Sequence, residues 1–421
     1  MKTPRNLFLC LLICCAFCVQ AQTIFTTQPF VSQIKTLRVV EVGETDWERP
    51  VLALDDNRRL EISFDELSHD EHYYSYTVMH CNADWTLSDL QSTEYLQGFT
   101  TLDIQDYQQS LNTTQIYTHY RFEIPNDDMQ LKLSGNYVVL IYEDGDKNNV
   151  VATACFSVVE PMADLDIRVR YNTLKDLNGR HQQLDINASF DQGSSQWATE
   201  TKLVIKQNNR MDNRVYDVKP TYVSSNQLRY IDNHALVFEG GGEYRHFDLA
   251  SLYLLGYNVN SINYDHNYYH VTLESDRFME GTPYNGQEDV DGQFRINAER
   301  ANDVDTEADY VWVHFFVPTD KPYLSGQMYV GGDFSYNLLS AENCMKYDNY
   351  LHGYTYSALL KQGGYNYQYW FFPKGREAAT LLPTEGSHWQ TQNEYSVYLY
   401  YRPFGQRYDR LIGYRTIKSR P

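Results

Sequence analysis

Apolar and aromatic residues alternate with polar residues along most of this chain, and this alternation restricts the fold more than any other feature. Tyr120, Phe122 and Ile124 share one face of an extended segment, with Arg121 and Glu123 on the other. A period of two is typical of half-buried β-strands, because successive side chains of a strand point to opposite faces. The same period recurs in three further segments, residues 73–80, 167–171 and 184–190.

Denser apolar runs and turn signals complete the pattern. Residues 137–142 and 310–317 are apolar almost throughout, as expected of central sandwich strands. Turns rich in Gly, Asn and Asp separate the strands, and the longest is 143–149. A helix is expected only as one or two turns after Asp84, around residues 87–91. We therefore predict an all-β fold of tandem immunoglobulin-like or early-set β-sandwich domains.

The 421 residues exceed the usual size of a single core. Glu160-Pro161 ends one strand-rich block, and the strand pattern restarts at Asp166. A polar stretch rich in acids, residues 297–309, precedes the next dense strand. Since each block approaches the size of one β-sandwich, we predict three such domains after the N-terminal segment. Their predicted bounds are 22–160, 161–297 and 298–421, the last resembling an early-set sandwich.

The N-terminus predicts export. Lys2 and Arg5 precede an apolar run of residues 7–18, and Val19-Gln20-Ala21 places small residues where a signal peptidase cleaves. This order predicts a signal peptide over residues 1–21, with a buried N-terminal helix or strand as the alternative. A lipoprotein signal is disfavoured, because no suitably small residue precedes a cysteine of the run. No later segment approaches the ~20 apolar residues of a membrane helix, so we expect a soluble mature chain.

Cysteine usage argues against a disulfide scaffold. Four of the seven cysteines lie in the predicted signal peptide, which leaves Cys81, Cys155 and Cys344. Three cysteines permit at most one internal disulfide. Cys81 and Cys155 fall in one predicted domain and could pair. We favour three buried thiols, because free cysteine is among the most buried residue types.

Charge and aromatic content narrow the partners. The formal net charge is −20, which disfavours binding to nucleic acid or to anionic lipid by charge. The 37 Tyr and 19 Phe suit pleated, half-buried strands. We therefore predict no nucleic-acid partner and no direct insertion into a membrane.

The sequence contains no familiar catalytic or cofactor motif. Outside the predicted signal peptide, the sequence has no Gly-x-Ser-x-Gly elbow, no phosphate loop, no His-Glu-x-x-His helix and no Cys-x-x-Cys pair. His80 and Cys81 with Asp84 suggest a metal or thiol site, but adjacent strand residues face opposite sides. A buried thiol and a hydrogen-bonded histidine at a strand end are the better interpretation. We predict no catalytic residue, no cofactor and no metal site.

An acidic turn resembles a calcium loop only in part. Asp144, Asp146 and Asn148 alternate as calcium ligands do. The EF-hand pattern also needs Gly at its sixth position and Glu at its twelfth, where this chain has Asn149 and Cys155. We predict an ordinary acidic hairpin turn here.

Two aromatic strands near the C-terminus suggest a glycan-binding alternative. Residues 329–334 and 365–370 look like the V-x-G-x-F and Y-x-Y-x-F/W strands of early-set sandwiches that bind glycogen or starch. Glycan binding predicts that Phe334, Tyr367 or Trp370 is exposed on a flat face. Core packing is favoured, because alternating aromatics are the ordinary content of strands.

A set of short segments carries a more specific resemblance. The first half of the chain contains His80-Cys81-Asn82-Ala83-Asp84-Trp85, Glu94-Tyr95-Leu96-Gln97-Gly98-Phe99, Tyr117-Thr118-His119-Tyr120, Pro125-Asn126 and Ser134-Gly135-Asn136-Tyr137. The second half contains Gly242-Glu243-Tyr244-Arg245-His246-Phe247-Asp248, Leu360-Lys361-Gln362-Gly363, Asn393-Glu394-Tyr395, Tyr400-Tyr401-Arg402-Pro403 and Arg407-Tyr408-Asp409-Arg410-Leu411. From Thr36 to Leu411 the chain resembles the plug protein family of the type IX secretion system.

The resemblance implies a periplasmic protein without enzymatic activity. Members of this family close the periplasmic mouth of the outer-membrane translocon barrel while its gating partner is absent. No catalytic residue, cofactor or assigned contact residue comes with the resemblance, so the partner-binding residues stay unknown. Asp84 is expected to cap the following turn and Trp85 to lie in the core, with partner contact as the alternative.

Three functions remain open from the sequence. The first is a plug of the translocon, with tyrosines among its contact residues. The second is a periplasmic carbohydrate-binding β-sandwich protein. The third is a hydrolase built on β-sandwiches, which needs converging catalytic groups that the sequence does not identify.

Overall fold

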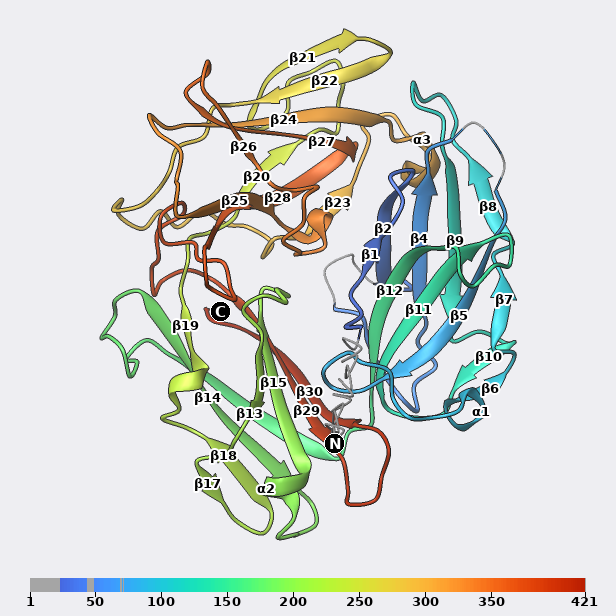
Figure 1. The fold of residues 1–421 in the computed structure, drawn as a ribbon, viewed down its shortest axis with the longest axis vertical. Coiled ribbons are helices and arrows are strands. Elements are labelled where there is room, and N and C mark those ends of the chain that lie inside the picture. Colours follow the sequence, from blue (N-terminus) through green and yellow to red (C-terminus); the bar gives the residue numbers. More distant parts are fainter. Residues whose placement is uncertain (1–22, 44–48, 69, 71, 421) are drawn as a thin grey trace, which may run out of the picture.

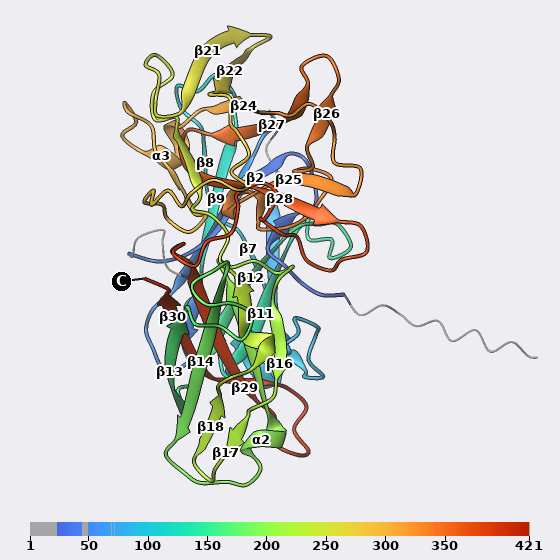
Figure 2. The same ribbon diagram turned by 90° about the vertical axis from the view of Figure 1, so that its left-hand side faces the viewer.

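The structure, a computed structural model, describes residues 23–43, 49–68, 70 and 72–420. The predicted signal peptide, residues 1–21, lies outside the described residues. Strands arranged in mostly antiparallel sheets dominate the fold, which confirms the predicted all-β class. Three sandwiches lie side by side in a flattened body (Figures 1 and 2). Every helix among the described residues has four residues or fewer, so none is long enough to cross a membrane.

The first sandwich consists of residues 23–160 and packs two sheets over one core. One sheet has the order β1 (Gln28–Pro29), β12 (Val150–Val159), β11 (Gly135–Glu143), β5 (Tyr74–Cys81) and β7 (Thr101–Asp103), with β3 (Val51–Ala53) parallel to β12. The facing sheet has the order β2 (Ile34–Glu41), β4 (Leu60–Glu66), β9 (Thr118–Ile124) and β8 (Asp106–Gln109). A small ribbon of β10 (Met129–Leu131) and β6 (Leu96–Gly98) follows α1 (Ser92–Tyr95).

The dense run in β11 reflects burial on both faces. Tyr137, Val139 and Ile141 point into the main core between the sheets. Val138 points the other way, into a smaller cluster with Cys81 and Trp85. Alternation disappears from the sequence where neighbouring parts of the chain cover the outer face of a strand.

The second sandwich combines residues 163–239 with the C-terminal strands, residues 394–418. Its first sheet has the order β13 (Ala163–Arg170), β14 (His181–Phe190), β18 (Gln227–Tyr230) and β17 (Tyr222–Val223), with β19 (Val237–Glu239) also on β14. Its second sheet has the order β16 (Val215–Val218), β15 (Thr201–Gln207), β29 (Glu394–Tyr401) and β30 (Arg410–Lys418). The short helices α2 (Trp197–Glu200) and η1 (His234–Leu236) border this sandwich.

The third sandwich, residues 244–390, is inserted between β19 and β29. One sheet has the order β20 (Arg245–Asp248), β28 (Gly363–Pro373) and β23 (Phe294–Ile296), with β25 (Gly326–Gly331) also on β28. The other has the order β21 (Val259–Asp265), β22 (Tyr268–Leu273), β24 (Tyr310–Pro318), β27 (Gly353–Lys361) and β26 (Lys346–Asp348). The short helices α3 (Val304–Glu307) and η2 (Asp333–Ser335) lie in its connections.

The predicted boundary between residues 297 and 298 is wrong. Residues 245–296 share one core with residues 308–371, so no domain ends there. The C-terminal residues 394–418 leave that core and pair with β15, where Leu203 faces Leu399. Pairing between strands almost two hundred residues apart leaves no local signal, which is why the sequence suggested consecutive blocks.

The acidic stretch near residue 300 is a docking segment and not a linker. Asp303 caps α3, accepting a hydrogen bond from the backbone N of Asp305. Asp305 forms an ion pair with Arg38 of the first sandwich, 2.6 Å apart. Asp309 accepts the backbone N of Thr114, also from the first sandwich, at 2.8 Å. Asp305 and Asp309 therefore join two sandwiches instead of being solvated.

Candidate interaction surface and interdomain joints

The segments that define the family resemblance meet where the first two sandwiches touch, around Asp409. This carboxylate is 1% exposed and accepts hydrogen bonds from the backbone N of Ala83 at 3.0 Å and from Arg402 Nε at 2.8 Å. Lys202 Nζ lies 3.1 Å from both of its oxygens. Arg402 also donates to Asn82 Oδ1 at 2.5 Å. We call this group the Asp409 joint. The carboxylate of Asp409 is desolvated and is paired with two partly exposed cations, so loss of these partners is expected to be costly.

Asn136 extends the Asp409 joint through the sheet of the first sandwich. Its Oδ1 accepts hydrogen bonds from Ser157 Oγ at 2.8 Å and from Tyr400 OH at 2.9 Å. Its Nδ2 donates to the carbonyl of Asn82 at 2.9 Å. Each polar atom of this buried amide has a partner, as buried polar groups require.

His80 and Cys81 lie on opposite faces of β5, as predicted. His80 Nε2 donates to the carbonyl of Ser134 at 3.1 Å. Burial lowers the pKa of His80 to about 4, so the ring is neutral at physiological pH. Gly135 is required beside it, because a Cβ there would lie 2.4 Å from His80 Nε2. Tyr408 packs edge-on against the same ring, with centroids 5.3 Å apart. The histidine is thus a packing group of the joint.

A second joint, which we call the Asp65 joint, fastens the first sandwich to the third. Asp65 accepts hydrogen bonds from Lys361 Nζ and Tyr310 OH, each at 2.6 Å, and from His119 Nδ1 at 2.7 Å. The side chains of Asp65 and Lys361 are both 1% exposed. Burial works against the charge of Asp65, but Lys361 and His119 outweigh it and keep the pKa of Asp65 below its ordinary value. Lys361 also stacks over the ring of Tyr117, 4.3 Å from its centroid.

Arg49 links all three sandwiches. Its Nε donates to Glu394 of the second sandwich at 2.6 Å, and its Nη1 donates to Asp333 of the third at 2.9 Å. Arg49 itself precedes β3 of the first sandwich. The planar guanidinium suits such a branched contact, because it presents several donors in fixed directions.

The segment around Arg245, which is part of the family resemblance, has an internal role in the third sandwich. Arg245 Nη2 lies 2.8 Å from Glu385 and Nη1 lies 2.9 Å from Asp276. Its guanidinium also lies over the ring of Tyr369, 5.3 Å from the centroid. This network ties the segment after β28 to the start of β20.

The aromatic strands that suggested glycan binding are internal. Tyr367 and Trp370 are both 0% exposed. Phe334 packs edge-on against Tyr365 with centroids 5.7 Å apart and belongs to the rim of the third core. Arg210 of the second sandwich covers the ring of Trp370 at 4.4 Å. These residues form no flat exposed face, so the glycan hypothesis loses the side chains on which it depended.

The three cysteines of the described chain are free. Cys81 is fully buried, whereas Cys155 and Cys344 are half-buried. The prediction of three buried thiols is therefore wrong for two of them. Burial raises the pKa of the Cys155 thiol to about 12, so this thiol is protonated at neutral pH.

The remaining site predictions concern local turns and the core. Asp84 Oδ1 accepts hydrogen bonds from the backbone N and the hydroxyl of Thr86, and so caps the turn after β5 as predicted. Trp85 is buried, 7% exposed, against Cys81 and Val138. In the acidic turn, Asp146 accepts the backbone N of Asn148 at 2.9 Å, as a hairpin turn does. Among the described residues no three His, Cys, Asp or Glu side chains are grouped to hold a metal ion.

One exposed apolar segment stands out from the rest of the surface, the β20–β21 loop of residues 251–257. Tyr253 is 74% exposed, Leu254 65%, Leu255 61% and Tyr257 58%. Single exposed apolar residues are normal, but four within five positions are unusual for an acidic protein and are typical of a binding surface. We call this segment the apolar loop.

Contacts with β20 and with Arg300 hold the apolar loop in place. Gly256 approaches Asp248 so closely that a Cβ would lie 2.0 Å from its carbonyl oxygen. The ring of Tyr257 stacks on His246 with centroids 4.2 Å apart. Arg300 lies over Tyr253 at 5.5 Å. Because its base is fixed, the loop presents its side chains with little ordering cost on binding.

Sequence reasoning missed the apolar loop and the Asp65 joint. A local signal for the loop existed, since Tyr253-Leu254-Leu255-Gly256-Tyr257 is an apolar run without alternation between two strands. No local signal existed for the joint, whose partners Asp65 and Lys361 are almost three hundred residues apart.

The fold and surface define a class of protein. The chain is a multi-sandwich β protein whose buried polar clusters hold its parts together and whose most apolar exposed segment is a fixed loop. Comparison with known families gives the particular one. Residues 34–160 match the type 9 secretion system plug protein 1st domain. Residues 34–160 therefore form a first domain of the type IX secretion system plug family, which confirms the resemblance in the sequence.

A solved structure extends the similarity over nearly the whole chain. This chain is similar to a hypothetical protein from Parabacteroides merdae ATCC 43184, whose crystal structure was solved at 2.30 Å resolution. The two sequences are 41% identical. The match covers 94% of this chain and 100% of that chain, with a TM-score of 0.92. No curated protein matches this chain.

Proposed function

We propose that this protein is the plug of a type IX secretion system. It binds the periplasmic opening of the outer-membrane translocon barrel and seals it while the gating partner is absent. It resides in the periplasm and acts by contact, without catalysing a reaction. The observation that carries this proposal is the match of residues 34–160 to the first domain of the plug family.

The joints between the sandwiches support a sealing role. A stopper must keep its shape when the barrel pushes against it. The Asp65 joint and Arg49 connect the sandwiches through buried ion pairs. The Asp409 joint connects the first two sandwiches through hydrogen bonds, from Ala83 N to Asp409 and from Arg402 to Asn82. Breaking the Asp65 or Arg49 ion pairs leaves an uncompensated charge, so relative motion of the sandwiches is opposed.

The apolar loop is the contact surface that fits a barrel partner best. A stable interface buries more than about 1,000 Å² and is centred on aromatic and aliphatic anchors. Tyr253 and Tyr257 supply large area with a polar tip, and Leu254 and Leu255 supply purely apolar area. The acidic remainder of the protein does not attract anionic lipid, which leaves a protein surface as the occupant.

The direct test is recovery of the translocon from cells that lack the gating partner. We expect this protein to co-purify with the barrel in those cells and to be displaced when the gating partner is restored. Recovery of an intact translocon without this protein contradicts the proposal. Deletion of the protein in the same cells is also expected to make the outer membrane permeable to large antibiotics.

A loop variant identifies the contact. Replacing Leu254 and Leu255 with Ser and Tyr253 with Ala removes the anchors without touching a core, so folding is retained. We expect co-purification with the translocon to fall at least about tenfold, as loss of interface anchors does. The matched control is Tyr350→Ser, a 91% exposed tyrosine at another hairpin of the same sandwich. Equal recovery of the loop variant and the control contradicts the assignment of the loop.

A further inference from the structure

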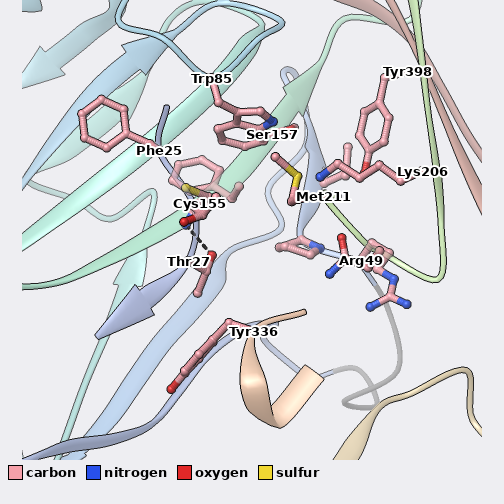
Figure 3. A pocket seen from close by; sticks show the side chains of 15 residues that line it. Phe25, Thr27, Arg49, Trp85, Cys155, Ser157, Lys206, Met211, Tyr336 and Tyr398 are labelled. Atoms are coloured by element: carbon pink, nitrogen blue, oxygen red, sulfur yellow. Dashed lines mark hydrogen bonds between the residues drawn. The ribbon is translucent and has the colours of Figure 1, made fainter. Parts of the chain in front are cut away.

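A cavity of about 90 Å³ lies where the three sandwiches meet. It is distinct from the apolar loop and from the cores of the sandwiches. Its wall combines cationic, aromatic and sulfur-bearing side chains, as Figure 3 shows. Six of the lining residues matter here: Arg49, Trp85 and Cys155 of the first sandwich, Lys206 and Tyr398 of the second, and Tyr336 of the third.

Lys206 is the unusual group in this wall. It comes from β15 and is only 8% exposed. Its ammonium lies 5.6 Å from the ring centroids of both Trp85 and Tyr398. Within the described ranges the ammonium of Lys206 makes no hydrogen bond and no ion pair. The other deeply buried lysine, Lys361, is paired with Asp65. A buried ammonium without an anion is costly, and two aromatic faces offset only part of that cost.

The charged groups around Lys206 make an anion more favourable still. Burial, together with nearby Arg214 and Arg49, lowers the pKa of Lys206 to about 8. Cys155 is the acidic group beside it, and burial keeps that thiol protonated at neutral pH. Arg49 Nη2 and Arg214 Nη1 are buried and have no hydrogen-bond partner. The carboxylates near Arg49, Asp333 and Glu394, are already bound by its other nitrogens.

We propose that this cavity is a binding site for a small monocarboxylate with an apolar body. The carboxylate pairs with the ammonium of Lys206, and the apolar part lies against the aromatic and sulfur-bearing wall. The ligand thus supplies the missing counter-charge for Lys206 where the three sandwiches meet. This site goes beyond the plug role and does not depend on it.

The size of the cavity sets the class of ligand. A water needs roughly 10–15 Å³ of cavity measured in this way. A cavity of about 90 Å³ therefore holds on the order of six to nine small groups, the size range from butyrate to benzoate. An ion without an apolar body leaves the aromatic wall unfilled.

The test is calorimetric titration of the full-length mature protein with benzoate, and with benzyl alcohol as a neutral molecule of similar shape. We expect saturable binding of benzoate at pH 6.5 and none of benzyl alcohol. Because Lys206 loses its proton as the pH rises through about 8, we expect benzoate affinity to fall at least tenfold by pH 9.5. Absence of saturable benzoate binding overturns the proposal, and so does an affinity that does not change with pH.

Variants localise the site. Lys206→Met keeps the length of the side chain and removes the charge, and is expected to abolish benzoate binding. Lys206→Arg keeps the charge at high pH, so it is expected to bind at both pH values. The matched control is Lys219→Met, a lysine of the same sandwich that is 61% exposed. Benzoate binding that persists in Lys206→Met overturns the assignment.

A spectroscopic readout keeps the site testable if Lys206→Met does not fold. After reductive ¹³C-methylation of the wild-type lysines, one methyl resonance is expected to titrate near pH 8. Saturating benzoate is expected to move that midpoint upward, because the bound carboxylate favours the charged amine. A midpoint that benzoate leaves unchanged overturns the proposal. Tighter binding of inorganic phosphate than of benzoate also overturns it, since the class of ligand is then wrong.

Discussion

At the scale of single residues, the polar groups of the family segments act as fasteners. Asp409, Asn136 and Lys361 are buried, and each bonds across a boundary between sandwiches. Such residues invite a catalytic interpretation when they are read in isolation. Their full hydrogen bonding argues for structure, because a group whose valences are all used by the protein has none left for a substrate.

His80 predicts an acid-sensitive stability. The folded protein keeps His80 neutral, with a pKa of about 4, while the unfolded chain takes up a proton near pH 6.5. The unfolded state therefore binds more protons between these values, and stability falls as pH drops from about 6.5 to about 4. Between pH 7 and pH 4.5 the loss is expected to be about 2.4 kcal/mol, measured by denaturant unfolding at these two pH values. In His80→Gln this part of the pH dependence disappears.

The control for His80 is His266→Gln, whose side chain is 88% exposed. This variant should keep the pH dependence of the wild type. A His80→Gln protein with unchanged acid sensitivity would show that other groups dominate.

Asp289 predicts a pH dependence of stability opposite in sign to that of His80. Burial raises the pKa of Asp289 to about 7, while its unfolded value is near 4. The folded state binds more protons between these values, so stability falls as pH rises from about 4 to about 7. Asp289→Asn cannot ionise. Its stability relative to the wild type is therefore expected to increase by a few kcal/mol between pH 5 and pH 8. A difference that is constant over this range contradicts the assignment.

Sequence patterns at this scale were informative when they were local. The opposite faces of His80 and Cys81, the turn at Asp84 and the burial of Trp85 all follow from strand geometry and residue type. The partners of Asp65 and Asp409 do not, because they come from strands brought together only by the complete fold.

At the scale of elements, strands were predictable and their partners were not. Alternation identifies β9, β13 and β14 directly from the sequence, since each has one buried face. It cannot tell that β29 belongs with β15, because every strand has the same period. On the outer face of Tyr310–Pro318, Tyr310 is buried and its hydroxyl bonds to Asp65 of the first sandwich, whereas Trp312, His314 and Phe316 are half-buried.

The Asp65 joint between β4 and β27 is testable by charge removal. Lys361→Met leaves Asp65 buried without its main counter-charge, which is expected to cost about 3–5 kcal/mol of unfolding free energy. Asp65→Asn with Lys361→Met is expected to cost less than Lys361→Met alone, because no charge is then stranded. Lys374→Met, at an exposed lysine of the same sandwich, is expected to be neutral. A double variant less stable than the single one contradicts this account of the joint.

At the scale of the whole molecule, the insertion of the third sandwich into the second makes the chain interdependent. The last strands, β29 and β30, complete the core of residues 163–239. Figure 1 shows these C-terminal strands beside β15, although almost two hundred residues separate β15 from β29 in the sequence. The protein is therefore expected to behave as one body, because the second sandwich needs the chain segments on both sides of the insertion.

Truncation tests this arrangement. A chain that ends after residue 390 loses β29 and β30 but keeps the third sandwich. We expect amide hydrogen exchange to accelerate throughout β14 and β15, because their core loses Tyr395, Val397 and Leu399. Three consecutive domains predict the reverse, namely protection of β14 and β15 and loss of protection in β24 and β27.

The central claim is that this plug-family protein closes its translocon through the apolar loop. The most direct measurement is site-specific photo-cross-linking in cells that lack the gating partner, with the cross-linking amino acid at position 253 and, as a control, at position 350. The account predicts a covalent adduct between this protein and the translocon barrel from position 253 and little from position 350. An adduct from position 350 alone, or none from either position while the translocon is present, would contradict it.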